Sequence, residues 1–375
     1  MDFYSSVAPG LVIVFALFVS LLCFRRIRRL SVKPCAKWRR ICERIALSAA
    51  IVMFLAAAAS TAFNALAIHH YRAVYPPQGR LYTVDGYKMH LYCTGEGSPT
   101  IVLDAGLGND SLIWANVQPT LSQTTRVCSY DRAGFGWSDL QPSPRDADRI
   151  TDQLHALLTQ AGTKGQIVLM GHSIAGLYIR DYAVRYPENL SALVFVDGST
   201  PLQEDRFPGR TKLVLLKAKL ELLQTKWLYV LGIPRITGEC NIGEGFDASA
   251  GKMLSEDQCR AGLFTALQRE DESFHQSGEE TIHTGPFGDL PILIFSQDNH
   301  PSGGEPLSKI DEIWDQMQEE LKSLSTRSRR IIAKGSSHYI QIDRPDLLNS
   351  KVADLVRQMR GEALPSIDYG TTKAE

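Results

Sequence analysis

The first eighty residues differ from the rest of the chain in how apolar and polar positions are distributed. Two uncharged stretches occur there, one from Val7 to Phe24 and one from Ile45 to Ile68. As helices they would span roughly 27 and 36 Å at about 1.5 Å per residue, against a hydrocarbon core of about 30 Å. The pattern predicts two transmembrane helices, so residues 1–70 are expected to form a two-span membrane anchor.

The charges between the two stretches predict the orientation of the anchor. Segment 25–44 is dense in Arg and Lys, with Glu43 as its only acid. The positive-inside rule makes this loop cytoplasmic and places everything after Ile68 on the extracytoplasmic side. A secretory signal peptide is one alternative, but it would carry positive charge before the first stretch, where MDFYSS has only an aspartate. Two buried core helices are the other.

Beyond a linker at residues 71–81, short apolar runs alternate with amphipathic segments. Residues 81–95 predict a β-hairpin, because Asp85-Gly86 interrupts an alternating pattern. Strand-helix alternation over this length predicts a mostly parallel sheet that is covered by helices on both faces. Further strands are predicted within 99–106, 125–131, 165–171, 190–198, 290–298 and 329–338, and helices at 146–161, 175–186 and 310–325.

Residues 201–285 interrupt this alternation. They are mostly helical in pattern and contain no buried-strand run. We expect them to form a helical cap that is inserted into a core made of residues 82–200 and 286–362. Residues 363–375 are expected to be a polar tail.

The composition and charge of the chain argue against some classes of function but do not identify one. The chain is 44% hydrophobic and 22% charged, which is typical of a globular protein. A formal net charge of −1 does not favour nucleic acid as a partner, because phosphate binding needs a concentrated basic surface. The sequence has no zinc-spaced Cys/His set and no Gly-rich phosphate loop, so we predict neither a metal nor an organic cofactor.

Ser173 is the candidate nucleophile. It follows the apolar run QIVLM and precedes the amphipathic AGLYIRDYAVRYP, with Gly171 two residues before it and Ala175 two residues after. A serine on a strained turn between a strand and a helix needs small neighbours at these positions, because larger side chains would meet the backbone. The strand before the motif and the helix after it favour a catalytic role over an ordinary turn.

With this motif, the chain from about Tyr82 to Met359 resembles the α/β-hydrolase superfamily. The stretch LDAGLGND is similar to the turn after the third strand in that fold, although the usual His is replaced by Ala105. The resemblance implies an oxyanion hole made by the backbone N–H groups of Leu107 and Ile174. The stretch YDRAGFGWSD is similar to a loop-shaping element, which implies structural roles for its charged residues, Asp131, Arg132 and Asp139.

The resemblance also implies the other members of a catalytic triad. His338, after the last predicted strand, matches the position of the base, and Asp298 in SQDNH matches the position of the acid. Asp197, at the end of the preceding strand, is the rival for the acid. Tyr339 and Trp114 are weaker candidates for the pocket wall, and His172 is expected to lie either at the surface or in the pocket wall.

Four cysteines lie in the part of the chain expected to be exported, where disulfides persist, and they allow three pairings. In the strand order of the resembled fold, the strand with Cys93 lies beside the strand with Cys128, which implies that these two are bonded. The pair Cys240 and Cys259 would then staple the cap. Four free thiols are the alternative.

These residues together predict a membrane-anchored serine hydrolase. The expected reaction is transfer of an acyl group from a small-molecule carboxylic ester to water, with a hydrophobic ester favoured by the nearby bilayer. Amide, thioester or carbon–carbon hydrolysis would use the same residues. A slow ligand-binding module and an anchored scaffold are the alternatives of other kinds.

Overall fold

The computed structural model describes residues 3–30, 37–207, 212–240, 244–298 and 308–362. The predicted polar tail, 363–375, lies outside the described residues. The chain divides into two compact units, which are described separately. Unit 1 comprises residues 1–76, 218–242 and 255–265, and unit 2 comprises 77–217, 243–254 and 266–375.

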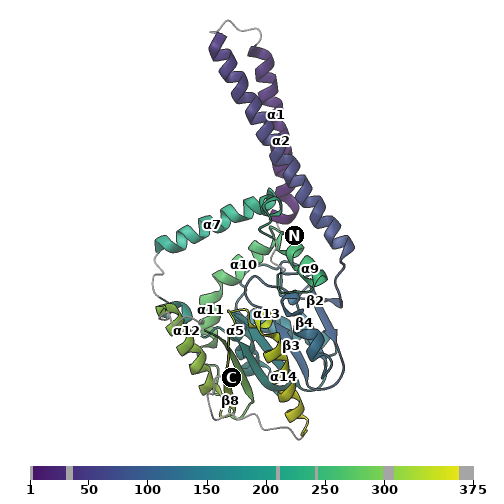
Figure 1. The fold of residues 1–375 in the computed structure, drawn as a ribbon, viewed down its shortest axis with the longest axis vertical. Coiled ribbons are helices and arrows are strands. Elements are labelled where there is room, and N and C mark those ends of the chain that lie inside the picture. The colour runs from purple at the N-terminus through teal and green to yellow at the C-terminus, as the bar shows by residue number, and fades with distance from the viewer. Residues whose placement is uncertain (1–2, 31–36, 208–211, 241–243, 299–307, 363–375) are drawn as a thin grey trace. The chain divides into compact units, whose positions relative to one another are not determined.

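Unit 2 is built on an eight-stranded sheet in the order β1-β2-β4-β3-β5-β6-β7-β8 (Figure 1). The pairs β1–β2 and β2–β4 are antiparallel and all later neighbours are parallel. The sheet and its helices confirm the predicted α/β-hydrolase fold. The strands are β1 (Arg80–Val84), β2 (Tyr87–Thr94), β3 (Thr100–Asp104), β4 (Val127–Tyr130), β5 (Ile167–His172), β6 (Leu190–Val196), β7 (Ile292–Gln297) and β8 (Ser328–Ala333).

The predicted hairpin is present as β1 and β2. Asp85 and Gly86 form its turn with φ values of 53° and 83°, the left-handed conformation that a two-residue hairpin loop requires. On the other side of β2, Cys93 is the register partner of Cys128 in β4, with Cα atoms 4.0 Å apart, and the two are disulfide-bonded. The bond joins neighbouring strands, as the strand order implied.

Side chains that alternate along the parallel strands supply two apolar cores, one on each face of the sheet. Leu103 and Met170 contribute to the core beneath α3 (Gln118–Leu121) and α14 (Pro345–Met359). Val102 and Leu169 point the other way, to the core that includes residues of α4, α5 and the turn after α12. Those helices are α4 (Ala147–Gln160), α5 (Ala175–Arg185) and α12 (Lys309–Glu320). Both faces of the sheet are therefore covered, as continuous apolar strands require.

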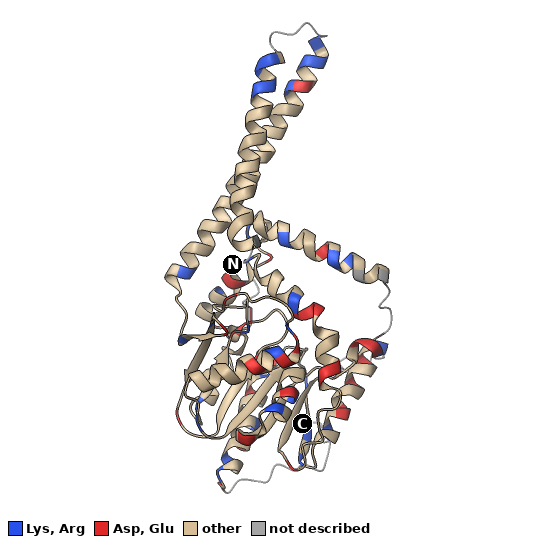
Figure 2. Ribbon diagram, turned by 180° about the vertical axis from the view of Figure 1, so that it is seen from behind, with Lys and Arg blue, Asp and Glu red and all other residues tan. Residues whose placement is uncertain are grey.

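Unit 1 contains a helical hairpin of α1 (Ala8–Leu30) and α2 (Lys37–Val74). The rings of Phe15 and Phe54 lie 6.1 Å apart, and Arg26 forms an ion pair with Glu43 at 2.8 Å, so the two helices run antiparallel. Both are long and apolar enough to cross a membrane. Figure 2 shows that basic residues gather near the connected ends of the two helices, while the shafts are almost free of charge.

The described parts of the segment predicted as a cap, 201–285, consist of helices joined by turns and contain no strand, but the segment is shared between the units. In unit 1, residues 218–242 and 255–265 pack with the hairpin, and a second disulfide joins Cys240 to Cys259. Residues 201–217, 243–254 and 266–285 belong to unit 2. The helices are α6 (Gln203–Arg206), α7 (Lys212–Val230), α8 (Ile233–Thr237), α9 (Ala248–Gln258), α10 (Leu263–Glu272) and α11 (Phe274–Thr281).

Candidate active site

Ser173 lies on the turn between β5 and α5. Its φ of 54° is unusual for a residue with a side chain, and a strained turn of this kind places a serine above the end of a sheet. The turn is tied to the next strand, because the Ser173 N–H donates to the Val196 carbonyl at 3.1 Å. The Ser173 carbonyl in turn accepts from Ser199 N–H at 2.8 Å.

The small residues around Ser173 are required by close backbone approach. A Cβ atom on Gly171 would lie 2.9 Å from the Ala175 carbonyl oxygen, and one on Gly176 would lie 2.8 Å from the Ser199 carbonyl oxygen. Both distances are too short for a side chain. Ala175 itself is fully buried and accommodates its methyl group, so the second glycine is needed one position later than the sequence motif suggested.

His338 lies in the loop after β8 and is hydrogen-bonded to Asp197, not to Asp298. The His338 Nδ1 and an Asp197 carboxylate oxygen are 2.6 Å apart, and the Asp197 side chain is completely buried. Asp197 directly follows β6 with a φ of 47°. The backbone N–H of Gln297 donates to its other oxygen at 3.1 Å, which fixes the carboxylate.

The prediction that Asp298 orients the histidine is therefore wrong. Asp298 follows β7, and its carboxylate accepts from the Gly335 N–H at 2.8 Å, while its own N–H donates to the Ser336 carbonyl at 3.2 Å. These contacts fasten the loop that carries His338 without reaching the imidazole. The rival acid, Asp197, was visible in the sequence as an aspartate at a strand end, but chain order alone could not rank it above Asp298.

Ser173 and His338 line one cavity of about 430 Å³. Leu107 and Ile174 line it too, so the structure brings together the predicted nucleophile, base and oxyanion-hole residues. Trp114 does not, because its ring is fully buried in a core of unit 2. The remaining wall is formed by residues of the cap segment and of α12 and its surroundings, which carried no recognisable motif: Gln203, Glu204, Phe207, Asp271, Phe274, Ile310, Asp311 and Trp314, with Ser199 and Gln297.

His172 contacts the loop that carries His338. Its Nε2 is 3.0 Å from the His338 carbonyl oxygen, and the two rings are 4.7 Å apart. Burial, together with the neighbouring His338, holds the pKa of His172 well below its usual range, so the ring is neutral. A neutral ring can donate one N–H to the His338 carbonyl, and this anchors the loop.

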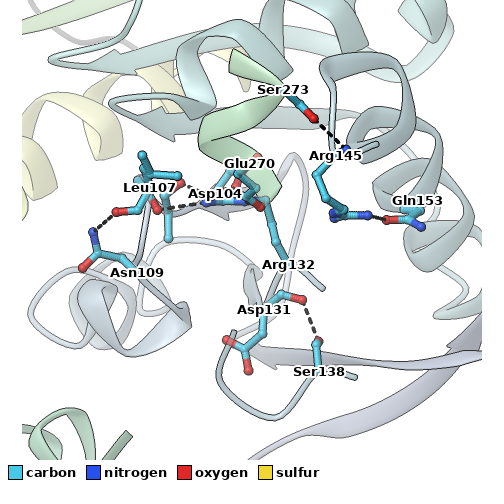
Figure 3. A network of polar contacts seen from close by, with 12 residues as sticks. Asp104, Leu107, Asn109, Asp131, Arg132, Ser138, Arg145, Gln153, Glu270 and Ser273 are labelled. Atoms are coloured by element: carbon cyan, nitrogen blue, oxygen red, sulfur yellow. Dashed lines mark hydrogen bonds and ion pairs between the residues drawn. The ribbon is translucent and has the colours of Figure 1, made fainter. Parts of the chain in front are cut away.

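The turn that carries Leu107 is held by a buried network that the sequence did not reveal (Figure 3). Arg132 donates to the Asp104 carboxylate at 2.7 Å and to the Gly106 carbonyl at 2.9 Å. The same guanidinium makes a bidentate pair with Glu270 of α10 at 2.8 and 2.9 Å. The contacts of Arg132 agree with the structural role that the sequence predicts for it, but nothing in the sequence marks Glu270 as its partner.

Charge is retained inside this network. Burial disfavours the Arg132 cation, but Glu270 and Asp104 outweigh that effect and hold its pKa well above the usual range. Burial raises the pKa of Asp104, although Arg132 and Tyr130 oppose the shift. Arg132 is thus a permanent cation that fixes the turn before Leu107 and joins it to helix α10.

Comparison with known proteins agrees with this architecture. The model of a family described as alpha/beta hydrolase fold matches residues 99–226. A thermophilic esterase from Thermogutta terrifontis has a similar structure at 18% identity, with a TM-score of 0.54 over 75% of this chain and 98% of that one. The epoxide hydrolase CorEH gives a TM-score of 0.55 at 13% identity, over 75% and 99% of the two chains. The family match and the similar structures agree with the α/β-hydrolase fold of this chain.

Two of the proteins that are similar in sequence are much longer than the part that matches this chain. A probable transporter, efuK, of Hormonema carpetanum is 28% identical over 70% of this chain, and an uncharacterized protein of Schizosaccharomyces pombe is 26% identical over 74%. The matches cover 40% and 56% of those two proteins, so the chain spans about half of their length. An uncharacterized Bacillus subtilis protein, YqjL, is 24% identical, and 91% of its length is matched.

Proposed function

We propose that this protein is a membrane-anchored serine hydrolase that cleaves a carboxylic ester, with Ser173 as nucleophile, His338 as base and Asp197 as the orienting acid. One observation carries the proposal. Ser173 stands on a strained turn and faces the same cavity as His338, whose Nδ1 is held by the buried carboxylate of Asp197. A serine hydroxyl becomes nucleophilic when a base that is oriented by a third group removes its proton.

The proposed reaction has two acyl-transfer steps. His338 Nε2 takes the Ser173 proton as Oγ attacks the ester carbonyl, and Asp197 stabilises the imidazolium that forms. The N–H groups of Leu107 and Ile174 stabilise the negative oxygen of the tetrahedral intermediate. His338 then gives its proton to the leaving alcohol, which leaves an acyl-serine. Water attacks that ester by the same steps and regenerates the free serine.

The cavity wall favours a neutral substrate with an apolar group. Phe207, Phe274 and Trp314 supply aromatic surface, and the Trp314 ring lies 5.7 Å from the His338 ring. Glu204, Asp271 and Asp311 line the same cavity and no lysine or arginine does, so its described wall carries acidic but not basic side chains. A negatively charged ester would be repelled there, and so would the acid released by hydrolysis.

The proposal is tested with the full chain in detergent or nanodiscs, beside Ser173→Ala. A fluorophosphonate probe should label the parent alone, and p-nitrophenyl esters of increasing acyl length should be hydrolysed by the parent and not by the variant. Neutral esters should react faster than matched esters with a terminal carboxylate. Equal hydrolysis by the variant would show that Ser173 is not the nucleophile.

Anchoring is the second half of the proposal. The two candidate spans support it, together with the basic residues near their connected ends. Carbonate extraction of cell membranes should leave the full chain in the pellet. Release into the supernatant would contradict the anchor without affecting the triad.

A further inference from the structure

Segment 218–236, which forms most of α7 and most of α8, exposes several large apolar side chains. The exposed fractions reach 58% for Leu220 and 62% for Ile236. Large contiguous apolar patches on a protein surface mark contacts with another protein or with a membrane. The exposed apolar side chains of this segment are Leu220, Leu223, Trp227, Leu228, Ile233 and Ile236.

The place where this segment contacts the hairpin suggests what covers it. The Asn64 amide donates to the Tyr229 carbonyl at 2.8 Å, and the Ser60 hydroxyl donates to the Leu231 carbonyl. Both donors belong to α2 and lie within the apolar stretch that begins at Ile45. At about 1.5 Å per residue they lie roughly 28 and 22 Å along the helix from Ile45, inside a hydrocarbon core of about 30 Å.

The contact is made at the end of the hairpin that is opposite to its basic loop. Ala8, near the start of α1, packs with Val230 and Ala261, and the Tyr4 ring lies 5.6 Å from Trp227. Aromatic side chains of this kind gather where a membrane meets water.

The charges of the segment are arranged as a lipid contact requires. Arg235 is paired with Glu256 and donates to the Asn64 side chain at 2.8 Å. Lys226 is 4% exposed, and its ammonium lies 5.2 Å from the centre of the Tyr4 ring. These two cations stay within unit 1, whereas Lys219 and Glu221 are exposed at the start of the segment, where long charged side chains can reach the headgroup region.

We propose that residues 218–236 lie in the outer leaflet of the same membrane that α1 and α2 cross, as a third, interfacial contact. The partner is the lipid surface, and the apolar side chains from Leu220 to Ile236 are its contact. This inference rests on the anchor part of the proposed function and is independent of the triad.

Spin labels on the full chain in phosphatidylcholine nanodiscs test the inference. Cys23, Cys35 and Cys42 are replaced by serine, and one label is placed through Leu220→Cys or Ile236→Cys. Dissolved oxygen, which concentrates in lipid, should relax these labels more than a water-soluble nickel chelate does. Leu55→Cys serves as the control for a span and Lys164→Cys as the control for water, where the chelate should prevail. Near-ultraviolet circular dichroism checks that each variant is folded.

Three other results of this experiment would each overturn the inference, and each would point to a different cause. If the label at Leu220 or Ile236 relaxes with the chelate while the label at Leu55 relaxes with oxygen, the anchor stands and the third contact is wrong. If neither reagent reaches Leu220 and Ile236, protein and not lipid covers the segment. If the label at Leu55 also behaves as in water, the anchor itself has failed.

Discussion

Two clusters of polar side chains lie near the carboxyl edge of the sheet, and they differ in how much of each is accessible from the cavity. In the first, Asp197 is completely buried and holds His338, whose side chain is 33% exposed and borders the cavity. In the second, Arg132, Asp104 and Glu270 are all at most 2% exposed and use their polar atoms on one another. A histidine that exchanges protons with a substrate must keep one ring nitrogen accessible. A buried cluster that holds a turn in place instead needs all of its charged groups to be paired. The difference predicts opposite responses to substitution.

The sharpest test of the first cluster is Asp197→Asn. Without the carboxylate the imidazolium is no longer stabilised and the tautomer is wrong, so kcat should fall about 10⁴-fold while KM changes little. Steady-state hydrolysis of the best p-nitrophenyl ester measures this, and the midpoint of thermal unfolding should stay close to that of the parent.

Asp298→Asn is the matched control. An asparagine side-chain oxygen can still accept the hydrogen bond from Gly335 N–H, so the loop stays in place and kcat should change by less than about tenfold. If the two substitutions had their effects reversed, Asp298 would be the acid in solution and the contact between His338 and Asp197 would have no catalytic role.

This pair of acids shows where sequence reasoning reached its limit. The strands, the hairpin turn at Asp85-Gly86 and the serine turn follow from local pattern, because short-range sterics and alternation determine them. Asp197 and Asp298 both follow buried strands, and which of them faces the histidine depends on how β6, β7 and the loop after β8 are arranged in space. Glu270 is harder still. Its partner Arg132 is 138 residues away, and a single acid in an amphipathic helix carries no local signal.

A substitution in the second cluster should lower the free energy of unfolding more than it lowers activity. Glu270→Gln leaves the buried Arg132 cation with one carboxylate partner, and breaking a buried ion pair costs about 3 to 5 kcal/mol. Urea unfolding of the full chain, followed by near-ultraviolet circular dichroism, should show this loss. The turn before Leu107 would also loosen, so the rate of fluorophosphonate labelling should fall modestly in the protein that remains folded.

Serine labelling distinguishes the two clusters. Asp197→Asn should be stable and unreactive, whereas Glu270→Gln should be unstable and still reactive at low temperature. A Glu270→Gln protein as stable as its parent would mean that Arg132 is adequately neutralised by Asp104 and that α10 is not needed to hold the turn.

Another buried acid, Asp181, lies on α5 and offers a smaller, pH-dependent effect. Burial raises the pKa of Asp181 to about 7, although a hydrogen bond from Thr151 opposes the shift. The folded protein therefore holds a proton that the unfolded chain, with an ordinary aspartate pKa, has already released. The stability contributed by this proton is present at low pH and is lost as the pH rises from about 4 through 7.

Asp181→Asn keeps the shape of the protonated side chain and removes its titration. The free energy of unfolding of the variant, relative to that of the parent, should rise by about 2 kcal/mol between pH 5 and pH 7, since one pKa unit corresponds to about 1.4 kcal/mol. Urea unfolding at both pH values measures the difference, and comparison with the parent removes the contributions of other groups. A constant difference across this range would show that Asp181 titrates normally, whereas kcat at pH 7 should be unaffected because the side chain lies outside the cavity.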